Sequence, residues 1–308
     1  DVDKDQGDNT RWTKFTQLMS DHLPVVMRTS ISHNASEFKV TTFNILTGHH
    51  PSQHTTHKEV PSAYENDCWE DKKKKKEYRG YRPKEDVLWK NRCELVKNAI
   101  IDSDIVMLNE TTSKQLSDVQ QSFEIAIFNT KIGNYDGSAI LYKPDVFDTP
   151  RKFYRQLMSD KSQIAVIAIL RHRATNTDIC FMSLHLKSGY KQHENLRKKQ
   201  FDSGWSILND FLGDQSTIPV VIAGDMNSDA FTEYGTLSEY VVETYGLVDI
   251  GAAENLPTYN HWHSSRFDYI FTRGLETLGM YIPQTSETTP NKKIGSDHFP
   301  VSAHLQIK

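Results

Sequence analysis

The sequence Gly295-Ser296-Asp297-His298-Phe299-Pro300 is the stretch from which the fold of this chain can be worked out. It places a carboxylate next to an imidazole, directly before an apolar run that predicts a strand. Other short apolar runs are closed or followed by polar residues of the same kinds, namely Asn44, Glu110, His185, Asp225, Asn227 and Asp268. Polar side chains at strand ends can converge at one edge of a sheet. Carboxylates, amides and imidazoles gathered there can hold a hard divalent cation and activate water against a phosphate.

The composition indicates a globular protein with room for one large domain or two ordinary ones. The chain has 308 residues, of which 37% are hydrophobic and 10% aromatic, enough to fill a core. No apolar run reaches the ~18 residues of a membrane span, and no secretory signal is visible. The net charge of -4 argues against a constitutive nucleic-acid coat but leaves room for a local basic groove. The three cysteines lack metal-site spacing and favour a reducing compartment, so we expect a cytoplasmic protein without a membrane partner.

Hydrophobic periodicity predicts strands alternating with a few helices. Strands are expected at residues 38–46, 105–108, 123–128, 138–142, 164–170, 179–186, 218–223, 267–271 and 301–305. Two helices are expected, one from Val87 onward with Asp86 as its cap and one over about 192–212. The sequence contains no internal repeat. This pattern predicts a layered α/β fold with mixed sheets.

Several of the polar residues are candidates for metal and phosphate contacts. Glu110 ends a hydrophobic strand, which would put its carboxylate at the sheet rim as a metal ligand, and Asn44 is the expected second ligand. His185 ends its own strand and could donate a hydrogen bond to phosphate. Lys187 and Arg266 lie near these motifs in the sequence and are candidate contacts for substrate phosphate. For each residue taken alone, a solvated or structural role is the simpler alternative.

A second group of residues is suited to activating water. Asp225 and Asn227 follow an apolar run that ends in a glycine, where the chain can bend so that both side chains face one pocket. Asp225 could orient or deprotonate water, and Asn227 could bind a developing oxyanion. Asp297 beside His298 is a more specific pair, because a carboxylate that holds an imidazole fixes its tautomer and supports its charge. Asp268 is expected as a further partner of His298 or as a metal ligand, and the base could be His298 or Asp225.

In this order, these residues resemble the endonuclease/exonuclease/phosphatase superfamily over residues 38–308. The local sequence is most similar to the deadenylase and nocturnin-like branch. The stretches that carry this closer resemblance are Trp89-x-x-Arg92, Gly137–Lys143, His185–Gly189, Glu194, Arg197, Gln200 and Asn227-Ser228. The chain departs from the branch at Asn109, where glutamine is usual, and in the length of segment 47–86.

The resemblance implies an α/β fold of the four-layer α/β sandwich type, with two packed mixed β-sheets flanked by helices. It also implies hydrolysis that depends on Mg²⁺, with Mn²⁺ as a substitute and with one or two ions bound. The positions it assigns are, for the metal, Asn44 and Glu110, and, for catalysis, His185, Asp225, Asn227, Asp268, Asp297 and His298. Among these, Glu110 would be the principal metal ligand, and Asp297 would support His298.

We expect three segments: an N-terminal extension over residues 1–37, a catalytic domain over 38–308, and a Lys/His-rich insertion within it at about 47–86. The insertion carries Lys72–Lys76 and the mixed aromatic and basic stretch Tyr78–Arg82. These could form a flap over a single nucleic-acid strand or remain a solvated loop. The histidines of the insertion lack the further ligands that would complete a zinc site.

The sequence therefore predicts a metal-dependent phosphoester hydrolase, a nuclease or a phosphatase, and indicates no particular oligomeric state. The expected partner is single-stranded RNA, hydrolysed by a 3′ RNA exonuclease of deadenylase type. Three alternatives are a phosphatase acting on a small phosphorylated nucleotide or metabolite, a DNA endonuclease or exonuclease, and a catalytically silent binding module. The complete set of site residues argues against the last of these.

Overall fold

The structure, a computed structural model, describes residues 35–47, 88–156, 163–189, 191–215, 217–261 and 263–308. All described residues belong to one compact unit, Ala35–Lys308. Most of the expected N-terminal extension and nearly all of the expected insertion lie outside the described residues, as do Lys72–Lys76 and the expected cap Asp86. Among the described residues, no helix is long and apolar enough to cross a membrane.

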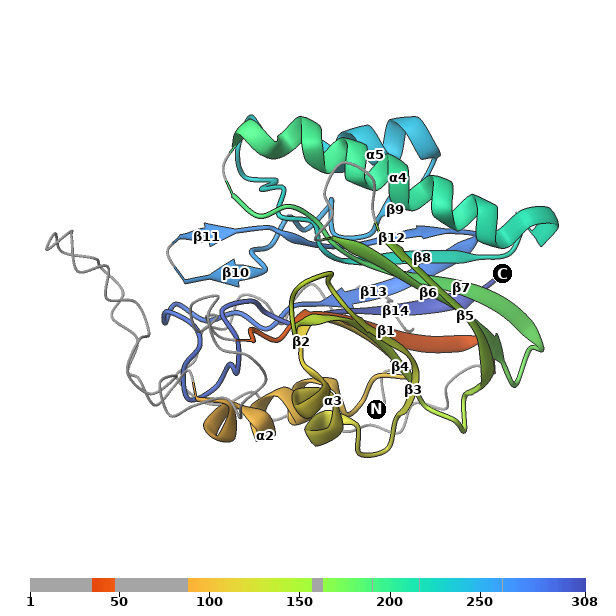
Figure 1. Cartoon of the computed structure of the whole chain (residues 1–308), viewed down its shortest axis with the longest axis horizontal. Helices are drawn as coiled ribbons and strands as arrows, with labels where there is room; N and C mark the ends of the chain where they lie inside the picture. Colours follow the sequence, from red (N-terminus) through yellow and green to blue (C-terminus); the bar gives the residue numbers. More distant parts are fainter. Residues whose placement is uncertain (1–34, 48–87, 157–162, 190, 216, 262) are drawn as a thin grey trace, which may run out of the picture. The chain divides into compact units, whose positions relative to one another are not determined.

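The first of two six-stranded sheets carries Asn44 and Glu110 on neighbouring strands (Figure 1). Its strand order is β13-β14-β1-β2-β4-β3. The strands are β1 (Glu37–Asn44), β2 (Ile105–Thr111), β3 (Glu124–Thr130), β4 (Gly137–Tyr142), β13 (Leu275–Tyr281) and β14 (Val301–Ile307). The β1–β2 pair is parallel and the other pairs are antiparallel, so the sheet is mixed.

The second six-stranded sheet carries His185, Asp225 and Asp268. Its order is β5-β6-β7-β8-β12-β9, with β7 and β8 parallel and the other pairs antiparallel. The strands are β5 (Phe147–Gln156), β6 (Ile164–His172), β7 (Thr177–His185), β8 (Val220–Asp225), β9 (Val248–Asp249) and β12 (Asp268–Arg273). A separate two-stranded ribbon pairs β10 (Tyr259–Asn260) with β11 (Ser264–Ser265).

Helices cover the outer face of each sheet, and the inner faces of the two sheets pack against each other (Figure 1). The helices are α2 (Trp89–Ile100), α3 (Ser113–Val119), α4 (Glu194–Leu212) and α5 (Leu237–Tyr245), with 3-10 turns η3 (Lys191–His193) and η4 (Gly213–Gln215) at the ends of α4. Val96 and Leu116 belong to the core between α2, α3 and the first sheet. Phe201 and Val241 belong to the corresponding core on the second sheet. Four layers result, which confirms the expected α/β sandwich with two packed mixed sheets.

The sequence predicted the central strands better than the edges. All nine expected strands are present with bounds shifted by a few residues, and α2 starts at Trp89 after the N-cap residue Leu88. The longer elements that were not predicted are β5, β13, α3 and α5. Both β5 and β13 are edge strands whose sequences, FDTPRKFYRQ and LETLGMY, contain no run of apolar residues long enough to predict a strand. The start of α3 did carry a sequence signal, because Thr112 and Gln115 form a capping box.

Strand register brings the predicted polar residues to one end of the facing sheets. In the parallel β1–β2 pair, Asn44 lies opposite Asn109. In the parallel β7–β8 pair, His185 lies opposite Asp225, which in turn lies opposite Asp268 on antiparallel β12. Strands β1 and β2 also contact β8 across the interior. Both sheets therefore contribute residues to one shared edge.

A buried arginine ties α2 to the loops at this edge. Arg92 is 1% exposed. It donates hydrogen bonds to three main-chain carbonyl oxygens, those of Ile45 at 2.8 Å, Leu46 at 2.7 Å and Gly295 at 2.6 Å. The first two follow β1 and the third precedes β14, so one side chain joins segments from the two ends of the described domain.

We predict that Arg92→Met lowers the free energy of unfolding by about 2–4 kcal/mol, because buried carbonyl oxygens lose their donors. Urea denaturation followed by tryptophan fluorescence measures this change. The matched control is Arg171→Met, because the Arg171 side chain is 50% exposed where it pairs with Asp178. An exposed pair of this kind contributes less than about 1 kcal/mol. Equal losses in the two variants would contradict the tethering role of Arg92.

Candidate functional site

Asn44 lies between two carboxylates at the shared edge of the sheets. Its Nδ2 donates to Glu110 Oε1 at 3.1 Å and to Asp225 Oδ2 at 3.0 Å. Its Oδ1 accepts the backbone N–H of Leu46 at 3.1 Å. Because a backbone N–H can only donate, this contact fixes which end of the amide faces the carboxylates. Asn44 is thus placed as a hydrogen-bond donor to Glu110 and Asp225, which differs from the metal-ligand role expected from the sequence.

Glu110 leaves the regular strand to reach the site. The β2–β4 register shifts between Asn109 and Thr111, and Glu110 has a φ of 51°, in the left-handed region that a residue with a side chain seldom adopts. Its carboxylate is partly buried and also accepts a hydrogen bond from Thr47 Oγ1 at 3.3 Å. Backbone strain of this kind gathers at functional positions, where surrounding structure holds it in place.

Asp225 is buried at the end of β8, 2% exposed. Burial raises its pKa to about 7, and the positive charge of His298 opposes that rise. Its Oδ1 accepts the backbone N–H of Asn227 at 2.9 Å. Asn227 also has a positive φ, 53°, and its Nδ2 donates to the Leu186 carbonyl oxygen at 3.2 Å. The bend after β8 therefore brings both predicted residues to the site.

His298 lies between two acidic side chains. Its Nδ1 is 2.7 Å from Asp268 Oδ2, and its Nε2 is 3.7 Å from Asp225 Oδ2. Burial alone would lower the pKa of His298, but the charges of Asp268 and Asp225 outweigh it and raise that pKa well above its ordinary value. The carboxylate that holds His298 by a hydrogen bond is thus that of Asp268. Asp297, expected in this role, has its Oδ1 3.3 Å from Ser296 Oγ and acts on His298 through its charge.

The imidazole of His185, unlike that of His298, is in its neutral form. It is 5% exposed, and its Nε2 lies 3.7 Å from Asp225 Oδ2. Burial lowers its pKa well below the ordinary value, and the charges of Lys131 and His298 add to that effect. Its Nδ1 has no hydrogen-bond partner among the described residues. A neutral histidine and a charged histidine therefore lie on either side of Asp225.

The two expected cationic contacts lie in different surroundings. Lys187 lies two residues after the end of β7. Its backbone is held by Gln200 and Arg197 of α4, while its side chain stays partly exposed. Arg266 is 4% exposed, pairs with Asp249 and lies over the Tyr269 ring at 4.5 Å. Its guanidinium thus belongs to a buried ion pair, which is not the open position expected for a phosphate contact.

The oxygen-rich side of this cluster fits a hard divalent cation. Glu110 accepts only long hydrogen bonds, at 3.1 and 3.3 Å, among those of the described residues, which leaves lone pairs on both oxygens. Asp268 Oδ1 is buried and lacks a hydrogen-bond partner within the described ranges. Asp225, Asp268 and His298 offer ligand atoms within 4.8 Å of one another, so they too could hold a metal ion. A cation bound by these three residues would have to displace the proton of His298. A position at Glu110 avoids this competition, so Glu110 is the favoured place for the metal.

Two buried polar residues that sequence reasoning did not assign support the site. Asn109 accepts the backbone N–H of Asp225 through its Oδ1 at 2.9 Å. Thr258 Oγ1 accepts the backbone N–H groups of Phe267 and Asp268, each at 3.0 Å. The position of Asn109 next to Glu110 was a usable signal, whereas Thr258 lies in a connecting segment that showed no pattern.

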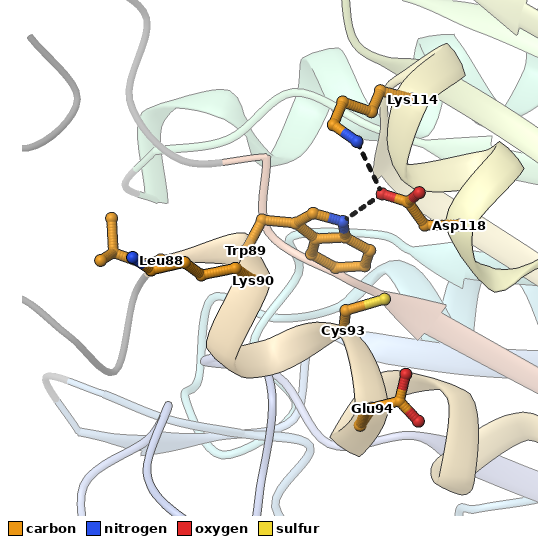
Figure 2. A pocket seen from close by; sticks show the side chains of 7 residues that line it. All are labelled: Leu88, Trp89, Lys90, Cys93, Glu94, Lys114 and Asp118. Carbon is orange, nitrogen blue, oxygen red and sulfur yellow. Dashed lines mark hydrogen bonds and ion pairs between the residues drawn. The ribbon is translucent and has the colours of Figure 1, made fainter. Parts of the chain in front are cut away.

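A surface recess between α2 and α3 lies apart from this cluster (Figure 2). Its lining residues are Leu88, Trp89, Lys90, Cys93, Glu94, Lys114 and Asp118. Figure 2 shows the Trp89 indole directed at Asp118, whose Oδ2 accepts from Trp89 Nε1 at 2.8 Å and from Lys114 Nζ at 3.2 Å. None of the lining residues belongs to the cluster around Asp225, so this recess is separate from the candidate site.

Comparisons with known proteins bear on both the fold and the family. A model of the Endonuclease/Exonuclease/phosphatase family matches residues 79–298. No curated protein matches the sequence. The human Nocturnin catalytic domain with a bound sulfate anion is similar in structure, with a TM-score of 0.64, 16% identity, and coverage of 90% of this chain and 95% of that chain.

Two further solved structures have the same fold. ANGEL2, a 2′,3′-cyclic phosphatase in complex with adenosine-2′,3′-vanadate, gives a TM-score of 0.63 at 17% identity over 88% of this chain and 96% of that chain. A mannosyl-6-phosphatase of Bacteroides thetaiotaomicron gives 0.59 at 18% identity over 87% and 99%. At such identities the structural likeness shows the fold, whereas the family match spans most of the chain. Enzymes of that family hydrolyse phosphoesters and generally depend on a divalent metal ion. The chain therefore belongs to the Endonuclease/Exonuclease/phosphatase family and is a phosphoester hydrolase.

Proposed function

We propose that the chain is a Mg²⁺-dependent phosphodiesterase that removes nucleotides from the 3′ end of single-stranded RNA, as deadenylases do. The observation that carries the proposal is the buried Asp268–His298–Asp225 chain, joined by Asn44 to the partly exposed Glu110. This arrangement supports two parts of the site: a metal side around Glu110, where a cation would bind, and a water side around Asp225, where water would be activated. Such a division is what phosphodiester hydrolysis requires.

The states of the ionisable groups support a role for each. Bound Mg²⁺ would neutralise phosphate oxygens as the reaction proceeds, and Glu110 is the residue best placed to hold it. His298 already carries its proton, so it is suited to stabilise negative charge and not to accept a proton. Asp225, with a pKa raised to about 7, is poised to take a proton from water near neutral pH. Neutral His185, next to Asp225, is suited to donate a hydrogen bond to a phosphate oxygen.

RNA as the substrate is supported by two kinds of observation. ANGEL2, similar in fold, is described in complex with an adenosine-2′,3′-vanadate, a ribonucleotide-like ligand. In this chain, Glu194, Arg197 and Gln200 of the nocturnin-like pattern bind the segments that follow β7 and β8, through Ser228, Gly189 and Lys187. The second candidate is a phosphatase of small phosphorylated nucleotides, favoured by the phosphatases among the structural neighbours.

A substrate panel tests the proposed function. We expect turnover of single-stranded poly(A) RNA from its 3′ end in Mg²⁺, loss of that turnover with chelator, and slower turnover of single- or double-stranded DNA. Products are resolved by gel electrophoresis and by chromatography of released nucleotides. Preferred hydrolysis of a small phosphorylated nucleotide would replace the RNA assignment with the phosphatase, and preferred cleavage of DNA would replace it with a DNA nuclease.

Glu110→Gln keeps the shape of the side chain and removes its charge. Because a neutral amide is a weak ligand for Mg²⁺, we expect turnover to fall by at least about 10²-fold while the protein stays folded. Turnover as a function of Mg²⁺ concentration and the thermal melting temperature measure the two effects. Glu124→Gln is the matched control, because Glu124 is exposed on β3 at the opposite end of the same sheet. Activity of Glu110→Gln equal to that of this control would remove Glu110 from the metal side.

The two aspartates near His298 are expected to differ. Asp268→Asn leaves the ring without the carboxylate that holds its Nδ1, so kcat should fall by on the order of 10²-fold with a smaller change in KM. Asp297→Asn removes a more distant charge and should lower kcat by less than about tenfold. Steady-state kinetics on the best substrate of the panel gives both values. A larger loss for Asp297→Asn than for Asp268→Asn would reverse the assignment.

A further inference from the structure

Asn109 connects the two sheets directly beneath the cluster. Asn109 lies on β2 in the first sheet. Its Oδ1 accepts the backbone N–H of Asp225, on β8 in the second sheet, at 2.9 Å. Its Nδ2 donates to Ser138 Oγ on β4 at 3.0 Å and to Ser183 Oγ on β7 at 3.2 Å. Asn109, Ser138 and Ser183 are all 0% exposed. One buried amide therefore uses both of its ends to join strands of both sheets.

The orientation of this amide follows from its partners. The N–H of Asp225 can only donate, so the atom that faces it must be the oxygen of Asn109. The two serine hydroxyls can then each accept one hydrogen from Nδ2. All polar atoms of the Asn109 side chain are thus satisfied within the described residues. Hydrogen bonding of this completeness in a buried place restricts the side chain to one position.

Gly224 allows β8 to pass close to the Asn109 amide. Gly224 precedes Asp225 and has a φ of 144°. A Cβ at that position would lie 1.8 Å from the Leu184 carbonyl oxygen and 2.9 Å from Asn109 Oδ1. Only glycine allows the strand to approach the amide this closely. Asn109 Oδ1 and the Leu184 carbonyl oxygen therefore both pack directly against Gly224 of β8.

We propose that Asn109 is a positioning residue that sets the separation of the Glu110 and Asp225 carboxylates. Glu110 is the next residue in the chain after Asn109, and the hydrogen bond of Asn109 ends on the main chain of Asp225 itself. Asn109 therefore links the main chains that carry the two carboxylates, whereas Asn44 links the carboxylates themselves. The assignment of those two sides rests on the proposed function.

The local structure explains why a precise length matters. Asn44 donates to both carboxylates, at 3.1 and 3.0 Å, and it lies opposite Asn109 in the β1–β2 register. A shift of β2 relative to β8 would break one of these two contacts. Displacement of a reacting group by about 1 Å can lower a rate by about 10²-fold. Asn109 also stands where the branch resembled by the sequence usually has glutamine.

The test uses Asn109→Gln, which keeps the amide and lengthens it by one methylene, and Asn109→Ala, which removes it. The control is Thr41→Val, because Thr41 is also buried in the first sheet and its Oγ1 joins Ser103 and Ser302, at 2.6 and 2.7 Å, away from the carboxylates. Melting temperature, kcat, KM and the affinity for Mn²⁺ are measured for the full chain. Calorimetric titration gives the Mn²⁺ affinity without any substrate.

We expect Asn109→Gln to lower kcat by at least about tenfold with a change in KM below about threefold, and to weaken Mn²⁺ binding several-fold. Thr41→Val should lower the melting temperature and leave kcat and Mn²⁺ affinity at wild-type values. If one of the two Asn109 variants does not fold, the other decides the outcome by its kcat and its Mn²⁺ affinity. An Asn109→Gln variant with lower stability but wild-type kcat and Mn²⁺ affinity would make Asn109 a structural residue and overturn the proposal.

The same experiment separates this inference from the proposed function. If the wild-type chain hydrolyses none of the RNA substrates, the RNA assignment fails, yet the Mn²⁺ titration still compares Asn109→Gln with wild type. A weaker Mn²⁺ affinity in that variant supports the positioning role whatever the substrate is. If the wild-type protein is active and Asn109→Gln has the same kcat and the same Mn²⁺ affinity, the positioning role is removed and the proposed function stands.

Discussion

The Asn44 amide, which donates to Glu110 and to Asp225, is the interaction on which the site depends. Two carboxylates in one partly buried place repel each other. A fold that gathers such groups must supply donors from fixed positions. Here Asn44, the backbone of Asn227 and the charged ring of His298 supply them. Most other features at this edge, from the left-handed backbone at Glu110 to the bend after β8, serve to bring these donors and acceptors together.

The two histidines show how environment divides one residue type into two chemical roles. His298 lies between Asp268 and Asp225, and these charges overcome the effect of burial and keep it protonated. His185 is equally enclosed, but Lys131 and His298 add positive charge to an already unfavourable desolvation, so its ring stays neutral. The result is a charged imidazole and a neutral one on either side of a single carboxylate. Because the two side chains are identical, the difference in their protonation comes from the neighbouring charges alone.

The sequence predicted the central strands and the residues that end them, because buried strands read as apolar runs and polar residues at their ends stand out. It could not predict the edge strands β5 and β13, because their sequences contain no apolar run of that kind. It also could not separate Asp268 from Asp297 as the partner of His298. That choice depends on the register of β12 against β8, which places Asp268 opposite Asp225. Arg266 illustrates the same limit, since only the fold reveals Asp249 as its partner.

The tie between the loop after β1 and the loop before β14 has a consequence for synthesis of the chain. Ser296 Oγ donates to the Asn44 carbonyl oxygen at 2.6 Å across a separation of 252 residues, and Arg92 spans 203 residues to reach Gly295. A growing polypeptide emerges from the ribosome with its N-terminal part first. Asn44 and Glu110 are exposed to the cell long before His298 is made. The hydrolase can therefore acquire its complete centre only after His298 has been made, and a product terminated before that residue carries Asn44 and Glu110 without it.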